Sequence, residues 1–147
     1  MSLRYQHDVI IRRTPAEVFA VIDDLPQTAK WLPPCVSLTK VGDGPNAEGD
    51  TLRYVYRQGK SSAEMAGRIL ARQQDARLHC LYSDAMFEVS VDLQVAAHPQ
   101  GTLSSHHISM MPKTLFSRLL QPLIRLGLGK QTRDAASNLK TLLESAA

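Results

Sequence analysis

Two adjacent histidines are the residues of this chain whose type and spacing first suggest chemistry. His106 and His107 follow each other in a segment with strand character, so their side chains point to opposite faces and cannot bind one metal ion together. His106 shares the parity of the apolar Ile108 and Met110, and we therefore expect it to face the interior. There it could act as an acid or base or orient a ligand, and the alternative is a core histidine with no catalytic task.

Three tyrosines could bind a ligand beside this histidine. Tyr54 and Tyr56 alternate with polar residues in one expected strand, and Tyr82 lies in another. A tyrosine can pack its ring against apolar neighbours while its hydroxyl bonds a ligand hydroxyl or carbonyl. The alternative for each of them is ordinary packing in the core or at its rim.

Several other patterns fail as functional motifs. Residues 129–132 resemble the end of a phosphate-binding loop, but Ile124 replaces the first glycine of that motif. Residues 43–50 are acidic without the spacing of a calcium loop. Cys35 and Cys80 lack the spacing of a metal-binding pair, and no nucleophile elbow is present. The sequence therefore predicts neither a metal site nor a cofactor.

The length and composition are typical of one globular domain. The chain has 147 residues and a formal net charge of +3, and we expect a single domain over residues 1–147. It contains neither the apolar stretch of a secretory signal nor a run long enough to span a membrane. Its basic residues are not interleaved with aromatic ones as in nucleic-acid-binding modules. We expect a cytoplasmic protein that has reduced cysteines and does not bind nucleic acid.

The elements that must position these residues follow a simple order. A strand over residues 3–13 precedes a helix that Thr14, Pro15 and Glu17 begin with a capping box, and a short helical turn then ends at Trp31. Alternation and turn residues predict six further strands, over residues 36–41, 50–57, 62–72, 77–83, 86–96 and 102–111. The short connections between them favour an antiparallel sheet with one buried face.

A long amphipathic segment over residues 112–144 ends the chain. Pro122 interrupts it, because its ring clashes with the carbonyl of Arg118, so we expect 113–121 to form a separate lead-in and the main helix to begin near Pro122. Gly127 and Gly129 weaken the helix and are expected where it passes over a cavity. We therefore expect ligand access at residues 114–129.

This order of elements resembles the helix-grip fold of the START-like or SRPBCC superfamily, which includes polyketide cyclases, the birch-pollen allergen family and lipid-transfer domains. The motifs that carry the resemblance are Thr14-Pro15-Ala16-Glu17-Val18-Phe19, Trp31, Gly49-Asp50, Gly101-Thr102, Pro122-Leu123 and the ending Leu139-Lys140-Thr141-Leu142-Leu143-Glu144. The resemblance implies an α+β fold in which a curved antiparallel sheet of about seven strands wraps around the C-terminal helix, with two short helices after the first strand.

The resemblance also implies a cavity between the sheet and the helix, whereas a solid core is the alternative. The alternation of side chains along the strands and their spacing along the helix give the expected cavity residues: Trp31, Tyr54, Tyr56, Met65, Tyr82, Phe87, Val89, His106, Ile108, Met110, Phe116, Leu120 and Ile124. Gly67 would leave room for a ligand because it has no side chain.

Three functions remain open at this point. The first is a carrier or sensor of a hydrophobic or amphipathic small molecule that resembles a lipid or a polyketide. The second is an enzyme of the cyclase, dehydratase or aromatase kind, in which His106 and a tyrosine guide proton transfer on a carbonyl compound. The third is a module that contacts a protein or a membrane surface, since residues 113–144 contain six basic and two acidic residues. The sequence does not indicate an oligomeric state.

Overall fold

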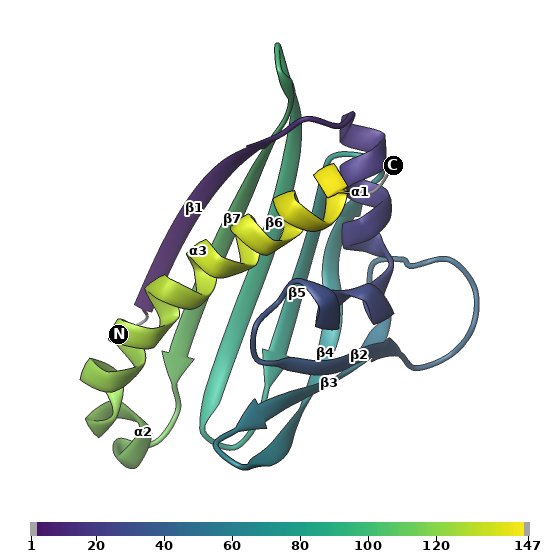
Figure 1. Ribbon diagram of the computed structural model, residues 1–147. Helices are drawn as coiled ribbons and strands as arrows, with labels where there is room; N and C mark the ends of the chain where they lie inside the picture. Colours follow the sequence, from purple (N-terminus) through teal and green to yellow (C-terminus); the bar gives the residue numbers. More distant parts are fainter. Residues whose placement is uncertain (1–2, 146–147) are drawn as a thin grey trace.

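One curved sheet and one long helix make up most of the molecule. The computed structural model describes residues 3–145 (Figure 1). Its elements are β1 (Leu3–Ile11), α1 (Pro15–Asp23), the 3-10 helix η1 (Leu25–Lys30), β2 (Cys35–Lys40), β3 (Thr51–Gln58), β4 (Ser61–Gln73), β5 (Arg77–Ser83), β6 (Phe87–His98), β7 (Gly101–Pro112), α2 (Leu115–Leu119) and α3 (Gln121–Ser145). The expected elements are all present, with bounds that differ by one or two residues.

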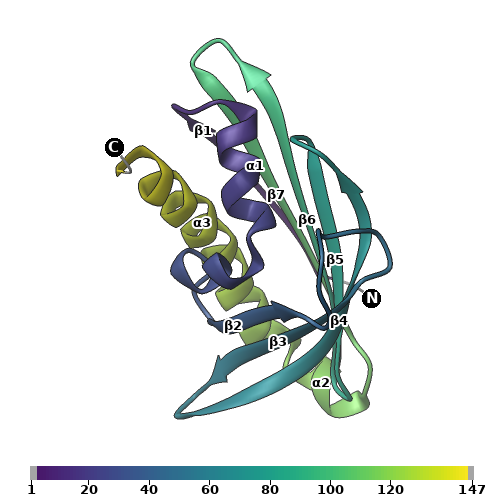
Figure 2. The ribbon, with the colours of Figure 1, turned by 90° about the vertical axis from the view of Figure 1, so that its right-hand side faces the viewer.

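The strands form a single antiparallel sheet in the order β1-β7-β6-β5-β4-β3-β2. Consecutive strands from β2 to β7 are neighbours, as short connections require. The first strand joins the far edge, where Leu3 pairs with Met110 and Ile11 pairs with Thr102. The sheet curves around α3, which crosses its inner face (Figures 1 and 2). The predicted α+β helix-grip fold is confirmed.

The start and the end of α1 are both fixed by side chains. The Thr14 hydroxyl accepts a hydrogen bond from the Glu17 backbone N–H, and the Glu17 carboxylate accepts one from the Thr14 N–H, so the predicted capping box is confirmed. At the other end the Asp23 carboxylate accepts two hydrogen bonds from Arg72, of 2.9 and 2.7 Å. This ion pair joins the end of α1 to β4.

The C-terminal segment is divided as Pro122 predicts. The short helix α2 ends at Leu119, and α3 begins at Gln121 and runs on to Ser145. The distal half of α3 is buried through Ala135, Ala136, Leu139 and Leu143, which pack on the sheet beside α1. The proximal half buries less of its surface, and the candidate site lies beneath it.

Candidate functional site

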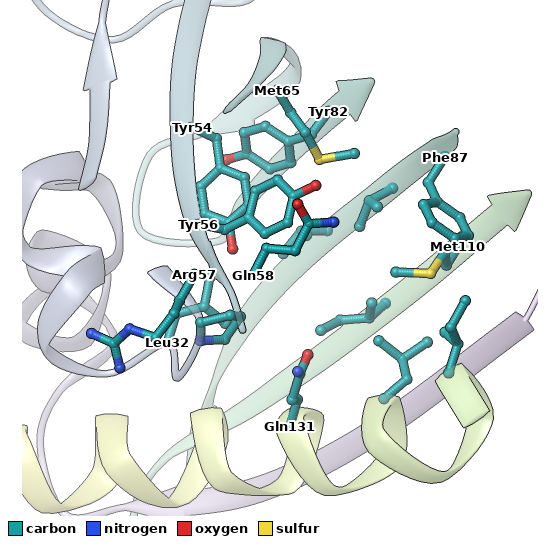
Figure 3. Close-up of a pocket in the computed structure, with 16 residues that line it drawn as sticks. Leu32, Tyr54, Tyr56, Arg57, Gln58, Met65, Tyr82, Phe87, Met110 and Gln131 are labelled. Atoms are coloured by element: carbon teal, nitrogen blue, oxygen red, sulfur yellow. The ribbon is translucent and has the colours of Figure 1, made fainter. Parts of the chain in front are cut away.

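A pocket of about 250 Å³ lies between the inner face of the sheet and the proximal half of α3 (Figure 3). Its walls come from the segment after η1, from β3, β4, β5, β6 and β7, and from α3. The residues that line it are Leu32, Pro34, Tyr54, Tyr56, Arg57, Gln58, Met65, Tyr82, Phe87, Val89, Val91, Ile108, Met110, Ile124, Leu128 and Gln131. Most of these side chains are apolar, which is typical of small-molecule sites.

The alternation of β6 and β7 produces the apolar wall. Phe87, Val89 and Val91 project from β6 on the inner face, and Val91 and Val89 pair with Ile108 and Met110 of β7. Ile124 and Leu128 lie one helical turn apart on α3 and face this wall. Strand parity and helix periodicity thus bring apolar side chains together from three elements.

Tyrosine rings form the opposite wall. The ring of Tyr54 stacks on Tyr56 with centroids 5.6 Å apart, and its centroid lies 5.0 Å from that of Tyr82. Burial raises the pKa of Tyr54 and of Tyr82 above the ordinary value, and burial together with the Asp84 carboxylate raises the pKa of Tyr56. The three hydroxyls are therefore neutral near pH 7 and can form hydrogen bonds without carrying charge.

Asp84 holds one of these tyrosines in place. The Tyr56 hydroxyl donates to Asp84 Oδ2 at 3.2 Å. The other oxygen, Oδ1, accepts the backbone N–H groups of Met86 and Phe87, each at 2.8 Å. Asp84 therefore fixes both the Tyr56 ring and the start of β6, so it is a positioning residue.

The sequence reasoning missed three polar residues of the pocket. Gln58 and Gln131 extend into it from β3 and α3, and Arg57 lies at the wall near Leu32 (Figure 3). Gln58 continues the parity of Tyr54 and Tyr56, but it lies just beyond the strand expected over residues 50–57. Gln131 follows Ile124 by two helical turns, which places it on the same face. These periodicities were the signal that could have identified both amides.

The predicted cavity residues fall into two groups. Those that line the pocket are Tyr54, Tyr56, Met65, Tyr82, Phe87, Val89, Ile108, Met110 and Ile124. Trp31, His106, Phe116 and Leu120 do not line it. Trp31 instead contributes to a separate cavity of about 30 Å³, which shares Leu32, Tyr82 and Val91 with the pocket.

His106 points inward but does not reach the pocket, which corrects the expected position of the candidate acid or base. It is buried to 1% exposure under Trp31, and the two rings meet edge to face. Its Nε2 lies 3.4 Å from the Ser104 hydroxyl. Burial, with smaller contributions from His7 and His107, lowers the pKa of His106 to about 4, so the imidazole is neutral at pH 7.

Phe116 and Leu120 also lie elsewhere than expected. The chain changes direction at Leu120 before Pro122, so α2 does not extend the inner face of α3. The Phe116 side chain is 63% exposed. Leu120 lines a shallow outer groove together with Leu123 and Gly127. Only the α3 residues after this break reach the pocket.

The expected role of the glycines also needs correction. Gly67 leaves no empty volume, because the Tyr82 ring occupies the space: a Cβ added to Gly67 would lie 2.5 Å from Tyr82 Cδ1. Gly129 similarly allows the Tyr5 ring to pack against α3. Gly127 lines the outer groove and has open space beside it. Of these three, only Gly127 borders open space.

The two cysteines are free and buried. Burial raises the pKa of Cys35 to about 11 and that of Cys80 to about 12, so both remain thiols at neutral pH. Among residues 3–145, no three His, Cys, Asp or Glu side chains are grouped so that they could hold a metal ion. The lining of the pocket therefore offers neutral hydrogen-bonding groups and a large apolar surface, while the guanidinium of Arg57 points away from Gln58 and Gln131 (Figure 3).

The curved seven-stranded sheet, the long C-terminal helix and the pocket between them define a helix-grip protein of the Bet v 1-like class. The chain belongs to the family described as polyketide cyclase / dehydrase and lipid transport, whose model matches residues 2–144. No curated protein matches the chain significantly.

Solved structures with the same fold have very different sequences. Zhui aromatase/cyclase from a Streptomyces species has a TM-score of 0.79 and 9% identity, covering 98% of this chain and 94% of that chain. A Thermus thermophilus protein has a TM-score of 0.78 and 15% identity, covering 100% of this chain and 99% of that chain. For Ara h 8.0201 the TM-score is 0.67 and the identity 15%, covering 99% of each chain. At such identities the similarity shows the fold alone.

Proposed function

We propose that this protein binds a hydrophobic or amphipathic small molecule in the pocket under α3 and acts as its carrier or sensor. The observation that carries the proposal is the pocket itself, whose wall is formed by Val89, Ile108, Met110 and Ile124. Burying apolar ligand surface against such a wall is favourable by about 25 cal/mol per Å². The free, buried cysteines fit a reducing compartment such as the cytoplasm.

The size of the pocket limits the ligand. Pockets for drug-sized molecules span about 300–1,000 Å³, and this one has about 250 Å³. We therefore expect a compact molecule of one or two rings or a short chain. A longer lipid would fit only with part of its length outside the pocket or with α3 displaced.

The polar side chains indicate what the ligand carries at one end. The amides of Gln58 and Gln131 extend into the pocket and supply both donors and acceptors (Figure 3). A ligand carbonyl or hydroxyl placed between them would be bonded from both walls. Because the Arg57 guanidinium points away from both amides (Figure 3), the groups at this end favour an uncharged part of the ligand.

A matched pair of variants tests the proposal. Met110 lines the pocket, whereas its neighbour Met111 has the opposite parity and is 43% exposed. We expect Met110→Trp to fill the pocket and prevent binding of naphthol, a small aromatic alcohol, while Met111→Trp retains wild-type affinity. Native mass spectrometry and isothermal titration would measure the binding, and circular dichroism would verify the fold. Equal affinity of both variants, or no binding by the wild type, would refute the proposal.

A cyclase or dehydratase activity is the second candidate. The observation that favours it is the hydroxyl of Tyr56, which lines the pocket and donates its proton to Asp84. Its oxygen could take a proton from a bound carbonyl compound while its own proton passes to Asp84. His106 is not part of this candidate because it does not line the pocket. An enzymatic function would be supported if the protein converts an aromatic polyketone and if Tyr56→Phe abolishes this conversion without loss of binding.

A further inference from the structure

Large apolar side chains lie uncovered on α2 and on the first two turns of α3. They are Leu115, Phe116, Leu119, Leu123 and Leu126, with exposed fractions from 63% for Phe116 to 78% for Leu126. Isolated exposed apolar residues are ordinary, but several within twelve consecutive positions of the chain mark an interaction site. We call these five residues the α2–α3 surface.

The α3 part of this surface lies opposite the pocket. Successive residues of an α-helix are rotated by about 100°, so Leu123 and Leu126 lie on one side of α3. Ile124 and Leu128 lie on the other side, where they line the pocket. The start of α3 is therefore apolar on both faces, and only the inner face is covered by the sheet.

The charged residues of the segment that carries the α2–α3 surface are all positive. The segment from Lys113 to Arg133 contains five basic residues and no aspartate or glutamate. Lys130 forms an ion pair with Asp134. Within residues 3–145, neither Arg118 nor Arg125 forms an ion pair, so both are available to an external anion.

We propose that the α2–α3 surface docks on an anionic lipid membrane. Its leucines and Phe116 enter the interface between headgroups and acyl chains, and Arg118 and Arg125 contact lipid phosphates and carboxylates. A second copy of this chain is a poorer partner, because a two-fold contact would bring the same arginines against each other. No helix among the described residues is both long and apolar enough to cross a bilayer, so the contact is peripheral.

The position of this surface connects it to the pocket. The outer groove beside α3 contains Leu120 and Leu123, and it shares Met110, Ile124, Leu128 and Gln131 with the pocket. The hairpin between β3 and β4, which follows the pocket residues Arg57 and Gln58, lies at the same end of the molecule as α2 (Figures 1 and 2). A docked protein would thus present this end, and the groove that leads to the pocket, to the bilayer.

Vesicle flotation tests the docking independently of ligand binding. The full chain is floated with vesicles of pure phosphatidylcholine and with vesicles that also contain phosphatidylserine, at low and at physiological ionic strength. We expect it to float with the anionic vesicles and to bind them more weakly as salt is added. Val89→Trp, which fills the pocket from β6 and does not line the outer groove, should float equally well, because the pocket is not needed for docking.

Two sets of variants separate the apolar and the charged contributions. We expect Leu123→Ser with Leu126→Ser, and Arg118→Glu with Arg125→Glu, each to reduce vesicle partitioning by about tenfold or more. Val41→Ser is the control, since Val41 is also exposed, at 63%, but lies outside the surface. Absence of binding by the wild type, or binding that both double variants retain, would overturn the proposal. The surface would be assigned to a second copy instead if the wild type forms a stable dimer and does not bind vesicles, and if Leu123→Ser with Leu126→Ser converts this dimer to a monomer.

Discussion

The indole ring of Trp31 meets the imidazole of His106 edge to face, with ring centroids 5.9 Å apart and planes at 89°. Trp31 lies at the end of η1 and His106 in the middle of β7, so this contact joins the short helices to the far half of the sheet. It also covers His106 and keeps it away from the pocket. His106, which strand alternation places inside the protein, is therefore a packed core residue and not a residue of the pocket.

Acidification should reveal this burial. Because the folded state lowers the pKa of His106 from 6.5 to about 4, the unfolded chain binds more protons between these values. The free energy of unfolding should therefore fall by about 3 kcal/mol as pH drops through this whole window. The carboxylates with lowered pKa lose their contribution as pH falls below their ordinary values, which are 3.8 for Asp23 and Asp92 and 4.5 for the glutamates Glu17, Glu64 and Glu144.

Urea unfolding at pH 7 and at pH 5 measures the effect, and the NMR titration of the His106 ring gives its pKa directly. In His106→Phe the decrease between the two pH values should be much smaller than in the wild type. A ring that titrates near pH 6.5 would show that the burial is not maintained in solution.

Gly67→Ala should destabilise the protein through Tyr82. The added Cβ would lie 2.5 Å from the Tyr82 ring, which must move or strain the sheet. We expect a loss of about 1–3 kcal/mol, as for other overpacked sites. Thermal and urea unfolding of Gly67→Ala, Tyr82→Leu and the double variant form a double-mutant cycle. Additive losses would indicate that the ring and the new methyl group do not meet.

The ion pair between Asp23 and Arg72 should contribute more to stability than any pair at the surface. Its side chains are only 21% and 18% exposed, and Asn46 also donates to Asp23. Asp23→Asn should lower the free energy of unfolding by about 1–3 kcal/mol, since the guanidinium then lacks its charged partner. Glu64→Gln, which breaks the exposed pair with Arg53, is the control and should have little effect. The reverse order of the two effects would contradict this assignment.

Gln131→Leu should change which molecules the pocket prefers. The amide of Gln131 extends into the pocket from α3, beside apolar neighbours (Figure 3). The variant should bind naphthol about three- to tenfold more weakly, because one hydrogen bond is lost, and should bind naphthalene as well as the wild type or better. Titration calorimetry with both compounds measures this change. A parallel loss for both compounds would mean that the substitution disturbs the wall of the pocket.

The fold and most of the pocket wall were accessible to sequence reasoning because both depend on local periodicity. The alternation of β6 places Phe87, Val89 and Val91 on one face whatever their partners are, and the clash at Pro122 requires a break in the helix. The parity of β7 likewise places His106 inside. None of these signals says which other element covers an inward side chain. The contact of Trp31 with His106, and the packing of Tyr82 over Gly67, depend on long-range geometry that periodicity does not contain.

The direction of α2 could not be predicted for the same reason. The apolar spacing of Leu115, Leu119 and Leu123 would be satisfied by one continuous buried helix face. The change of direction at Leu120 separates Leu115 and Leu119 from the inner face of α3, and Leu123 lies on the face of α3 opposite the pocket, so all three are exposed.

The proposed ligand site between the sheet and α3 is tested most directly by locating where a small ligand binds, because both the pocket and the α2–α3 surface are apolar. We propose methyl NMR of the wild-type protein during titration with naphthol. Saturable shift changes at the methyl groups of Val89, Met110 and Ile124, with little change at Leu115 and Leu126, are expected from binding in the pocket. Shift changes confined to Leu115 and Leu126, or no saturable change at all, would contradict a ligand site between the sheet and α3.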